Sequence, residues 1–212
     1  QVFRDPAAWY HIVYVVDTTE STDTDRLALY LNGEKLTPSG TPTYPSQNAE
    51  TGVNNNALQE VGAVADAEDY DGYLAEFYLI DGQALTADSF GETNEDTNQW
   101  IPKEVIGMTY GTNGFYLKFE DTADLGNDSS GNGNDFTVSN LSAYDQVSDS
   151  PTNNFPTMNP LINPYTGLTY SDRNLQINKA ANSYAQAAST FGLPNSGKWY
   201  WEINRAIASG TG

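Results

Sequence analysis

Along four stretches of this chain, apolar residues either alternate with polar ones or occupy both faces of a short run, and both patterns predict β-strands. Residues 9–17 (WYHIVYVVD) are apolar on both faces, which indicates a central strand. Residues 27–31 alternate cleanly and run into Asn32-Gly33. That pair predicts a hairpin, because type I′ turns need two positive φ angles. Residues 73–80 and 114–120 give two further strands.

The phase of the alternation predicts which side chains are buried. In residues 114–120, Phe115, Leu117 and Phe119 fall on one face, and we expect that face to point inward. Residues 58–64 predict a short strand. Residues 85–90 predict a single helical turn with Thr86 as its N-cap.

The second half of the chain has a different character. Residues 123–170 are rich in Pro, Asn and Gly and predict a connecting arm, and strand signals return at residues 174–177 and 198–203. We therefore predict an all-β protein: an antiparallel β-sandwich of jelly-roll type in residues 1–122, the C-terminal part of such a domain, then the arm, then the beginning of a second sandwich in residues 171–212. A strand as apolar as residues 9–16 needs neighbours on both sides, so we expect them from a longer chain of which this is a fragment, or from other chains.

Composition narrows the possible functions. The 212 residues contain no cysteine, which excludes disulfides and thiol chemistry, and carry a formal charge of −19. Such a charge repels phosphate backbones and anionic lipids, so we expect no binding to nucleic acid. No apolar stretch approaches the roughly 20 residues that cross a bilayer, so we expect no membrane insertion.

Three motifs in order resemble a known family. Trp9 to Val13 (WYHIV), Leu29 to Gly33 (LYLNG) and residues 70–78 (YDGYLAEFY) are similar to the WxHV strand, the LYVNG hairpin and the FxGxIDEVRIY strand of concanavalin A-like, laminin-G-type jelly-roll domains. The family has Ile-Asp-Glu where this chain has Leu74-Ala75-Glu76, so its first acidic position is lost here.

A second resemblance begins near Asn174. Residues 175–177 and the stretch SGKWYWEI (residues 196–203) resemble the opening strands of a SPRY domain. A laminin-G-like unit, a proline-rich connector and a SPRY-like unit in series look like tail-fibre or other structural proteins of marine bacteriophages.

The combined resemblance implies a non-enzymatic virion structural protein, such as a tail fibre, head fibre or decoration element on the particle surface. Its expected partners are other virion proteins, copies of itself in a homo-oligomer such as a trimer, and host surface glycans. The alternative is a lectin-like carbohydrate-binding module of a bacterial surface or secreted protein.

Enzyme chemistry has little support in the sequence. A glycoside hydrolase needs two carboxylates across the scissile bond, but Glu76 is followed at alternating positions by Tyr78 and Ile80, and Glu202 is followed by Asn204. The one histidine, His11, lies inside an apolar strand, where we expect a packed or hydrogen-bonded structural imidazole. We therefore expect no enzyme.

Two kinds of binding site are candidates. We expect no cofactor to be required. Calcium is the cofactor that oxygen-rich acidic loops could hold; the candidate ligands are Asp66, Asp69, Asp71, Asp124 and Asp128. Glycans stack on aromatic rings near loops; the candidate residues are Tyr44, Tyr70, Tyr73 and Tyr110. The alternatives to binding are purely structural: the acidic loops are ordinary turns, and the tyrosines serve in packing.

Overall fold

The chain folds almost entirely into short β-strands and loops. The computed structural model describes residues 8–53, 58–64, 68–70, 72–143, 145–160, 167–171, 174–179, 185–193 and 195–204. Within these residues the helical structure consists of two 3₁₀ turns, η1 (Asp23–Asp25) and η2 (Ala87–Ser89). The all-β class is therefore confirmed. The described strands form one three-stranded sheet and several two-stranded ones, and the jelly-roll arrangement stays a prediction.

The three-stranded sheet follows the sequence pattern closely. It consists of β1 (Ile12–Val16), β2 (Leu27–Leu31) and β3 (Glu34–Lys35) in that order, with antiparallel neighbours. Asn32 and Gly33 turn the chain between β2 and β3 with φ angles of 48° and 83°. The hairpin predicted from Asn-Gly is confirmed, with the two positive φ angles that it requires.

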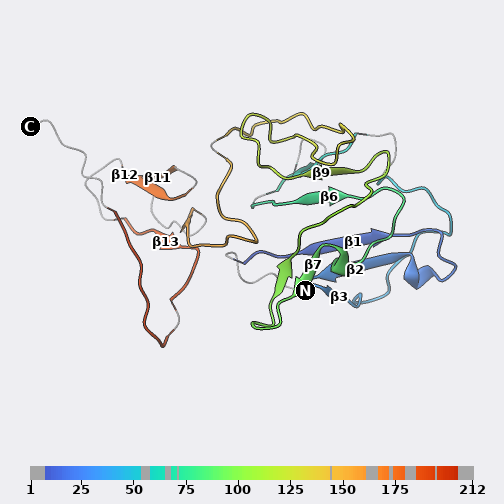
Figure 1. The fold of residues 1–212 in the computed structure, drawn as a ribbon, viewed down its shortest axis with the longest axis horizontal. Helices are drawn as coiled ribbons and strands as arrows, with labels where there is room; N and C mark the ends of the chain where they lie inside the picture. Colours follow the sequence, from blue (N-terminus) through green and yellow to red (C-terminus); the bar gives the residue numbers. More distant parts are fainter. Residues whose placement is uncertain are drawn as a thin grey trace, which may run out of the picture.

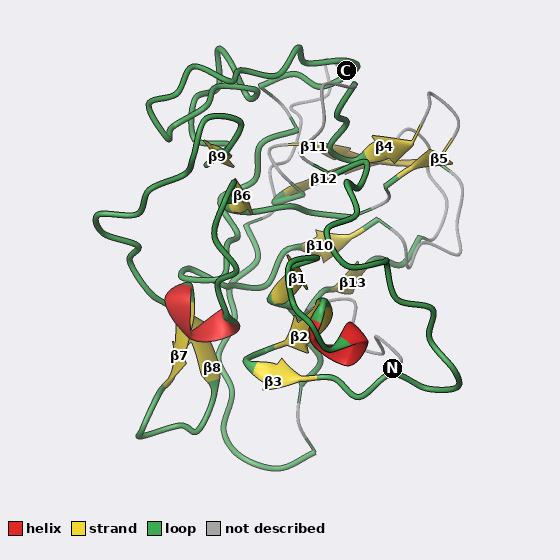
Figure 2. Cartoon of the chain, turned by 90° about the vertical axis from the view of Figure 1, so that its right-hand side faces the viewer, coloured by secondary structure: helices red, strands yellow, loops and turns green. Residues whose placement is uncertain are grey.

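Two strand pairs lie beside this sheet. The first joins β6 (Phe77–Leu79) to β9 (Phe115–Leu117), and the second is a hairpin of β7 (Gly91–Thr93) and β8 (Trp100–Pro102) that the sequence pattern did not predict. Figure 1 shows β9, β6, β1, β2 and β3 one after another across the larger part of the molecule, and Figure 2 shows the same succession from the side.

The remaining strands are short pairs. They are β4 (Ala63–Val64) with β5 (Glu68–Asp69), β10 (Met158–Asn159) with β13 (Ala188–Ser189), and β11 (Leu168–Ser171) with β12 (Gln176–Lys179). The last four strands form a smaller part at one end of the molecule (Figure 1). The strand expected over residues 58–64 is reduced to β4, and the structure forms no strand over residues 198–203, where one was expected.

The helical turn expected over residues 85–90 is present as η2, and Thr86 takes the N-cap position. No side-chain capping hydrogen bond accompanies it. Across the described ranges, no helix combines the length and the apolar character that a bilayer crossing demands.

Trp100 packs between the three-stranded sheet and the β7–β8 hairpin. A Cβ added at Gly33 would collide with the six-membered ring of this indole, and one added at Gly91 would lie 2.7 Å from it. Both glycines therefore let the ring approach bare backbone. The turn after β2 and the first residue of β7 are held on the same aromatic side chain.

His11 completes this packing. Its imidazole stacks on Trp100 with ring centroids 5.8 Å apart, and the indole Nε1–H donates a hydrogen bond of 3.0 Å to His11 Nδ1. The backbone N–H of His11 donates to the side-chain oxygen of Asn32. Burial lowers the pKa of His11 below its ordinary value. The imidazole thus has the structural surroundings that the sequence indicated, with Nδ1 unprotonated because it accepts a hydrogen bond.

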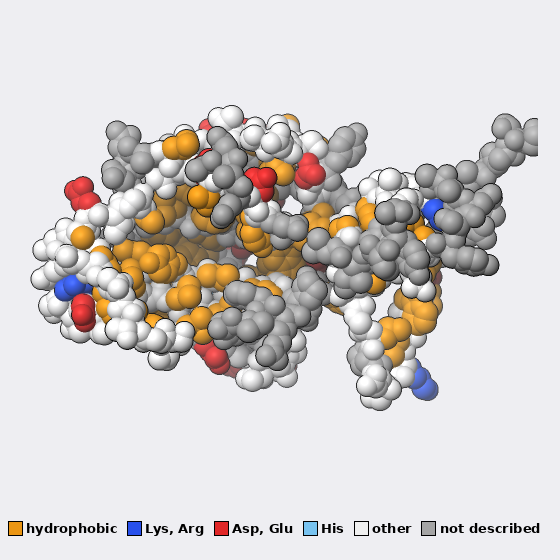
Figure 3. Space-filling view, turned by 180° about the vertical axis from the view of Figure 1, so that it is seen from behind, with side chains coloured by type: hydrophobic (Ala, Val, Ile, Leu, Met, Phe, Trp, Pro, Cys, Tyr) orange, Lys and Arg blue, Asp and Glu red, His pale blue; other side chains and the backbone are white. Residues whose placement is uncertain are grey.

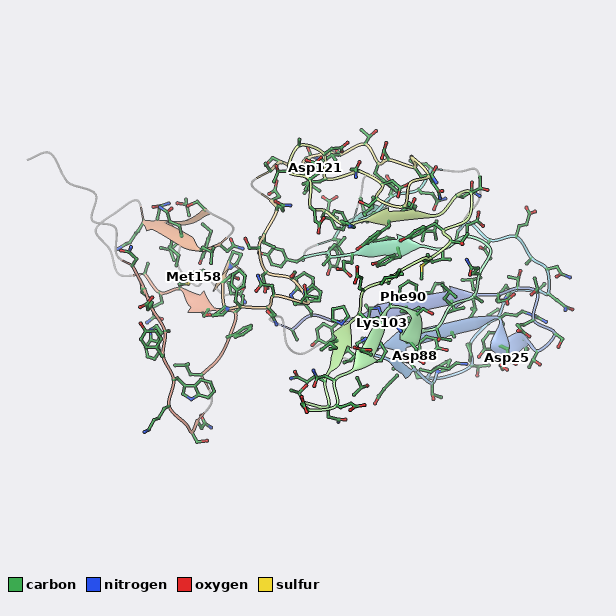
Figure 4. The ribbon with its side chains drawn as sticks, in the orientation of Figure 1. Asp25, Asp88, Phe90, Lys103, Asp121 and Met158 are labelled. Atoms are coloured by element: carbon green, nitrogen blue, oxygen red, sulfur yellow. The ribbon has the colours of Figure 1, made fainter. Side chains whose placement is uncertain are left out.

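Aromatic contacts continue from this cluster into the β6–β9 pair. Phe90 contacts His11 at 6.4 Å and Tyr78 at 5.2 Å between ring centroids, and Tyr78 stacks on Tyr116 at 4.0 Å (Figure 4 labels Phe90). Tyr78 and Tyr116 are cross-strand partners, so they share one face of the pair.

The opposite face of the β6–β9 pair is the better buried one. Phe115 and Leu117 are buried there, as the alternation predicted. Phe119 differs from the expectation: its φ of 57° takes the chain out of the extended conformation just after β9, and its side chain is only half-buried. The strand therefore ends three residues earlier than its sequence pattern predicts.

Gly33→Ala and Gly40→Ala form a matched pair that tests the contact between the Trp100 ring and the backbone of Gly33. The two glycines have φ angles of 83° and 84°, but a Cβ at Gly40 would meet nothing within 4 Å. Both variants lose about 1 kcal/mol through the left-handed backbone. Gly33→Ala should lose a further ~1–3 kcal/mol because the indole must move. Urea unfolding measures both losses, and equal losses would contradict the contact.

A pH scan of thermal unfolding tests the environment of His11. Because the folded state lowers its pKa, the unfolded state binds more protons just below the ordinary value of about 6.5. The stabilisation is therefore complete above that value and falls as the pH decreases through it. The wild type should lose more Tm between pH 7 and pH 5 than His11→Asn, in which the carboxylates titrate alike. Parallel Tm curves would refute a lowered pKa.

Candidate functional site

A shallow groove of about 330 Å³ runs along the β4–β5 hairpin and the start of β6. Its lining consists of Gly62, Ala63, Val64, Asp69, Tyr70, Leu74 and Phe77. The hairpin is closed by a hydrogen bond of 2.8 Å from the Tyr70 N–H to the Gly62 carbonyl, which fixes Tyr70 at the groove. Two separate chain segments therefore form its walls.

Apolar side chains in the groove are exposed to an unusual degree. Tyr70 is 56 % exposed and Val64 is 63 % exposed, and Leu74 and Phe77 are exposed as well. Asp69 is the acidic residue among those that line the groove. Mostly apolar walls with a few polar groups are typical of small-ligand sites.

The structure brings two of the four predicted tyrosines together. The Tyr70 hydroxyl lies 3.5 Å from the Tyr73 carbonyl oxygen, and the side-chain amide of Asn174 donates to the Tyr73 hydroxyl. Tyr110 is elsewhere: its ring stacks on Tyr116, and its pKa is raised by burial and then by Asp128. Tyr44 is half-buried in a loop and does not line the groove.

The predicted calcium ligands are distributed over separate places. Asp66 and Asp71 lie outside the described residues. Asp69 lines the groove, whereas Asp124 and Asp128 belong to the loop after β9. In the part of the chain that the structure describes, no group of three or more His, Cys, Asp or Glu side chains is arranged to hold a metal ion.

Asp128 occupies a site of its own. It is only 8 % exposed, and its Oδ1 accepts hydrogen bonds from the backbone N–H groups of Tyr116 and Ser130 at 2.9 and 2.8 Å. Its Oδ2 accepts from the Ser130 hydroxyl and from the Asn134 N–H at 2.8 and 2.9 Å. A carboxylate offers about four acceptor positions, and these four hydrogen bonds use them, which disfavours a cation at Asp128. Calcium at the predicted ligands stays a prediction.

The electrostatics of Asp128 reflect this hydrogen bonding. Burial on its own would raise the pKa of the carboxyl group, but the donors from Tyr116, Ser130 and Asn134 favour the ionised form and hold the pKa below its ordinary value. Asp128 is therefore a buried anion stabilised by backbone and side-chain donors.

Neighbouring side chains of the same loop hold it to β9 and to the turn before it. Asn132 donates from its amide to the carbonyls of Gly111 and Gly114, and Asn134 donates to those of Thr112 and Gly114. The Asp128 N–H in turn donates to Asp135. The run DSSGNGND (residues 128–135), which falls within the predicted connecting arm, thus forms a hydrogen-bonded cap on the edge of β9.

Glu76 has a charged neighbour that strand spacing could not reveal. Its pKa is raised by burial first and by Glu120 second, and lowered by Lys118. The search for alternating acids along one strand missed this pair because Glu120 comes from the neighbouring strand segment. The β6–β9 register pairs Phe77 with Leu117, so Glu76 and Lys118 follow at the same end of the ladder.

Comparisons of the chain with known protein families, with curated proteins and with solved structures find no match. Function is therefore inferred from the geometry of the chain itself.

Asp128→Asn tests the carboxylate network. The amide keeps a single acceptor oxygen, so at least one buried N–H of Tyr116 or Asn134 loses its partner, at a cost of about 2–3 kcal/mol. The exposed Asp121→Asn, labelled beyond β9 in Figure 4, is the control and should change stability by less than ~0.5 kcal/mol. Urea unfolding with and without calcium checks both. Calcium stabilisation that Asp128→Asn abolishes would instead assign this carboxylate to a cation.

Proposed function

We propose that this chain is a non-enzymatic adhesion and assembly module of a virion structural protein, part of a tail fibre, head fibre or decoration element. Its strands would belong to a jelly-roll sandwich of the concanavalin A-like type, followed by a SPRY-like unit. The groove along β4, β5 and β6 would bind glycans of the host surface.

The observation that carries this proposal is the exposed apolar lining of the groove. Tyr70 offers a ring on which the C–H face of a sugar can stack, and Leu74 and Phe77 extend that apolar surface. The Asp69 carboxylate beside them can accept hydrogen bonds from sugar hydroxyls. A shallow open groove of this kind suits a glycan that is held without being enclosed.

The groove is better suited to binding than to hydrolysis. Glycoside hydrolysis requires two carboxyl groups on opposite sides of the bond, roughly 5–10 Å apart. Among the described residues that line the groove, Asp69 alone carries a carboxyl group. Glu76 and Glu120 form an acidic pair near the end of the β6–β9 ladder, and neither lines the groove.

The virion setting is supported by the resemblance and by the charge. A net charge of −19 favours a module that stays in solution and away from nucleic acid and anionic lipid. Expected partners are other virion proteins and copies of the same chain. A lectin-like module of a bacterial surface or secreted protein would use the same groove, and it would be monomeric.

Tyr70→Ala tests the groove. On an array of bacterial surface oligosaccharides the wild type should retain specific glycans, and the variant should bind them at least ~10-fold more weakly, because loss of a stacking ring exceeds about 1.4 kcal/mol. Tyr44→Ala, which removes a tyrosine outside the groove, should bind as the wild type does. Isothermal titration of the strongest glycan gives both affinities.

Two outcomes would contradict the proposal. Equal losses in Tyr70→Ala and Tyr44→Ala would separate glycan binding from the groove. Sugar release by the wild type that Glu76→Gln abolishes would assign the chain to the hydrolases instead.

A further inference from the structure

Strand β1 has one unpaired edge. The Asn32 N–H bonds to the His11 carbonyl, and the Asp17 N–H bonds to the Arg26 carbonyl. Antiparallel strands alternate between residues that bond to the partner and residues that point away from it. The backbone groups of Ile12, Tyr14 and Val16 therefore point away from β2, and no other described strand pairs with β1.

Strand β6 has an unpaired edge as well. The backbone N–H and carbonyl of Tyr116 bond to Asp128 and Ser129, on the side of β9 away from β6. Tyr116 is the cross-strand partner of Tyr78, so the backbone groups of Tyr78 must point away from β9 in turn. In the described part of the chain β6 pairs with β9 and with nothing else.

Strands β1 and β6 are neighbours in the larger part of the molecule. In Figure 1, β6 and β1 are neighbours in the succession of strands and run in the same direction, and Figure 2 shows them adjacent from the side. A single strand placed between them would be antiparallel to both. We call this position between β1 and β6 the acceptor position. Figure 3 shows hydrophobic side chains gathered in a hollow across this larger part of the molecule.

The same chain carries a segment with the sequence pattern of a strand that forms no strand in the structure. Residues 198–203 (KWYWEI) alternate as a strand should, yet they pair with no described residue. Trp201 is 63 % exposed, and Trp199, Tyr200 and Ile203 are exposed too. Figure 1 shows this red segment in the smaller part of the molecule, away from β1 and β6. We call it the donor strand.

We propose that the donor strand of one copy occupies the acceptor position of a second copy, between β1 and β6, so that strand exchange assembles the chain into a homo-oligomer. This gives the self-association expected under the proposed function a location, and it does not involve the glycan groove. Backbone hydrogen bonds along both open edges would hold the strand, as in other cases of β-strand addition.

The size of the contact is adequate for a stable complex. The three aromatic side chains of the donor strand expose on the order of 400 Å². Two reciprocal exchanges, each covering a similar acceptor surface, would bury about 1,600 Å², which is the usual area of a stable interface. Since each copy carries a net charge of −19, the copies repel each other, and added salt should strengthen the assembly by screening that repulsion.

The experiment uses two full-length variants and their mixture. Trp199→Ser/Trp201→Ser disables the donor strand, and Tyr14→Lys disables the acceptor position, since lysine on an edge strand opposes pairing. Tyr14 is 58 % exposed in the single copy, so each variant should keep its fold. Light scattering should show an oligomer for the wild type and monomers for each variant. The mixture should form a heterodimer only at a higher concentration than the wild type needs, because one intact donor meets one intact acceptor and this single exchange buries about half the area.

Ile106→Lys is the control, because Ile106 is 81 % exposed and lies outside both segments; it should assemble as the wild type does. A wild type that stays monomeric up to about 100 μM, well above a micromolar Kd, would overturn the proposal. So would oligomers that persist in both variants, or a mixture that forms no heterodimer even at the highest concentration measured. Tyr14→Lys should still bind glycan, so failure of strand exchange and failure of the proposed function are separate results.

Discussion

The contact of Trp100 with bare backbone is the constraint on which the larger part of the molecule depends. The indole needs a flat surface on which to lie, and Gly33 and Gly91 provide it from two elements far apart in sequence. Its single polar atom also needs an acceptor in a half-buried position, and His11 provides one from β1. One side chain thus fixes the three-stranded sheet relative to the β7–β8 hairpin, and a change at any of the three contacts affects the other two.

The β6–β9 pair joins this arrangement through its tyrosine face. Phe90 contacts both His11 and Tyr78, and Tyr78 stacks on Tyr116, so the aromatic contacts run without a break from the sheet to β9. The other face and the outer edge of β9 are closed by the loop that contains Asp128. The Asp128 carboxylate accepts from the Tyr116 N–H, and the Ser129 N–H donates to the Tyr116 carbonyl. A further strand would otherwise pair with these two backbone groups.

Much of this arrangement could be predicted from the sequence where the signal is local. The alternation and the Asn32-Gly33 pair define β2 and its turn almost to the residue, because strand phase and turn geometry depend on neighbours in the chain. The β7–β8 hairpin could not be found in this way. Its strands have three residues each and one contains a proline, and what holds them is a contact of Trp100 with His11, 89 residues away.

The candidate sites also divide into features that local sequence predicts and features that depend on residues distant in the chain. Tyr70 and Tyr73 could be selected because they are aromatic residues close to loops, and the structure brings them together. Their neighbours Leu74 and Phe77 looked like core residues, since alternation reports the face of a strand and not whether another layer covers it. The acidity of residues 124–135 suggested calcium, but the amide and hydroxyl donors that occupy Asp128 depend on how the loop folds back onto β9.

The two outer edges of the β6–β9 pair differ in whether the chain itself satisfies their backbone hydrogen-bonding groups, and this difference bears on assembly. The β9 edge is closed within the chain by side chains of a short loop, a solution that needs no second molecule. The β6 edge and the β1 edge have no such cover among the described residues. Open edges invite indiscriminate pairing, and a charge of −19 opposes the approach of any like molecule at long range. Backbone hydrogen bonds act only at contact, so the two effects together favour a partner that presents a complementary strand in register over one that merely collides.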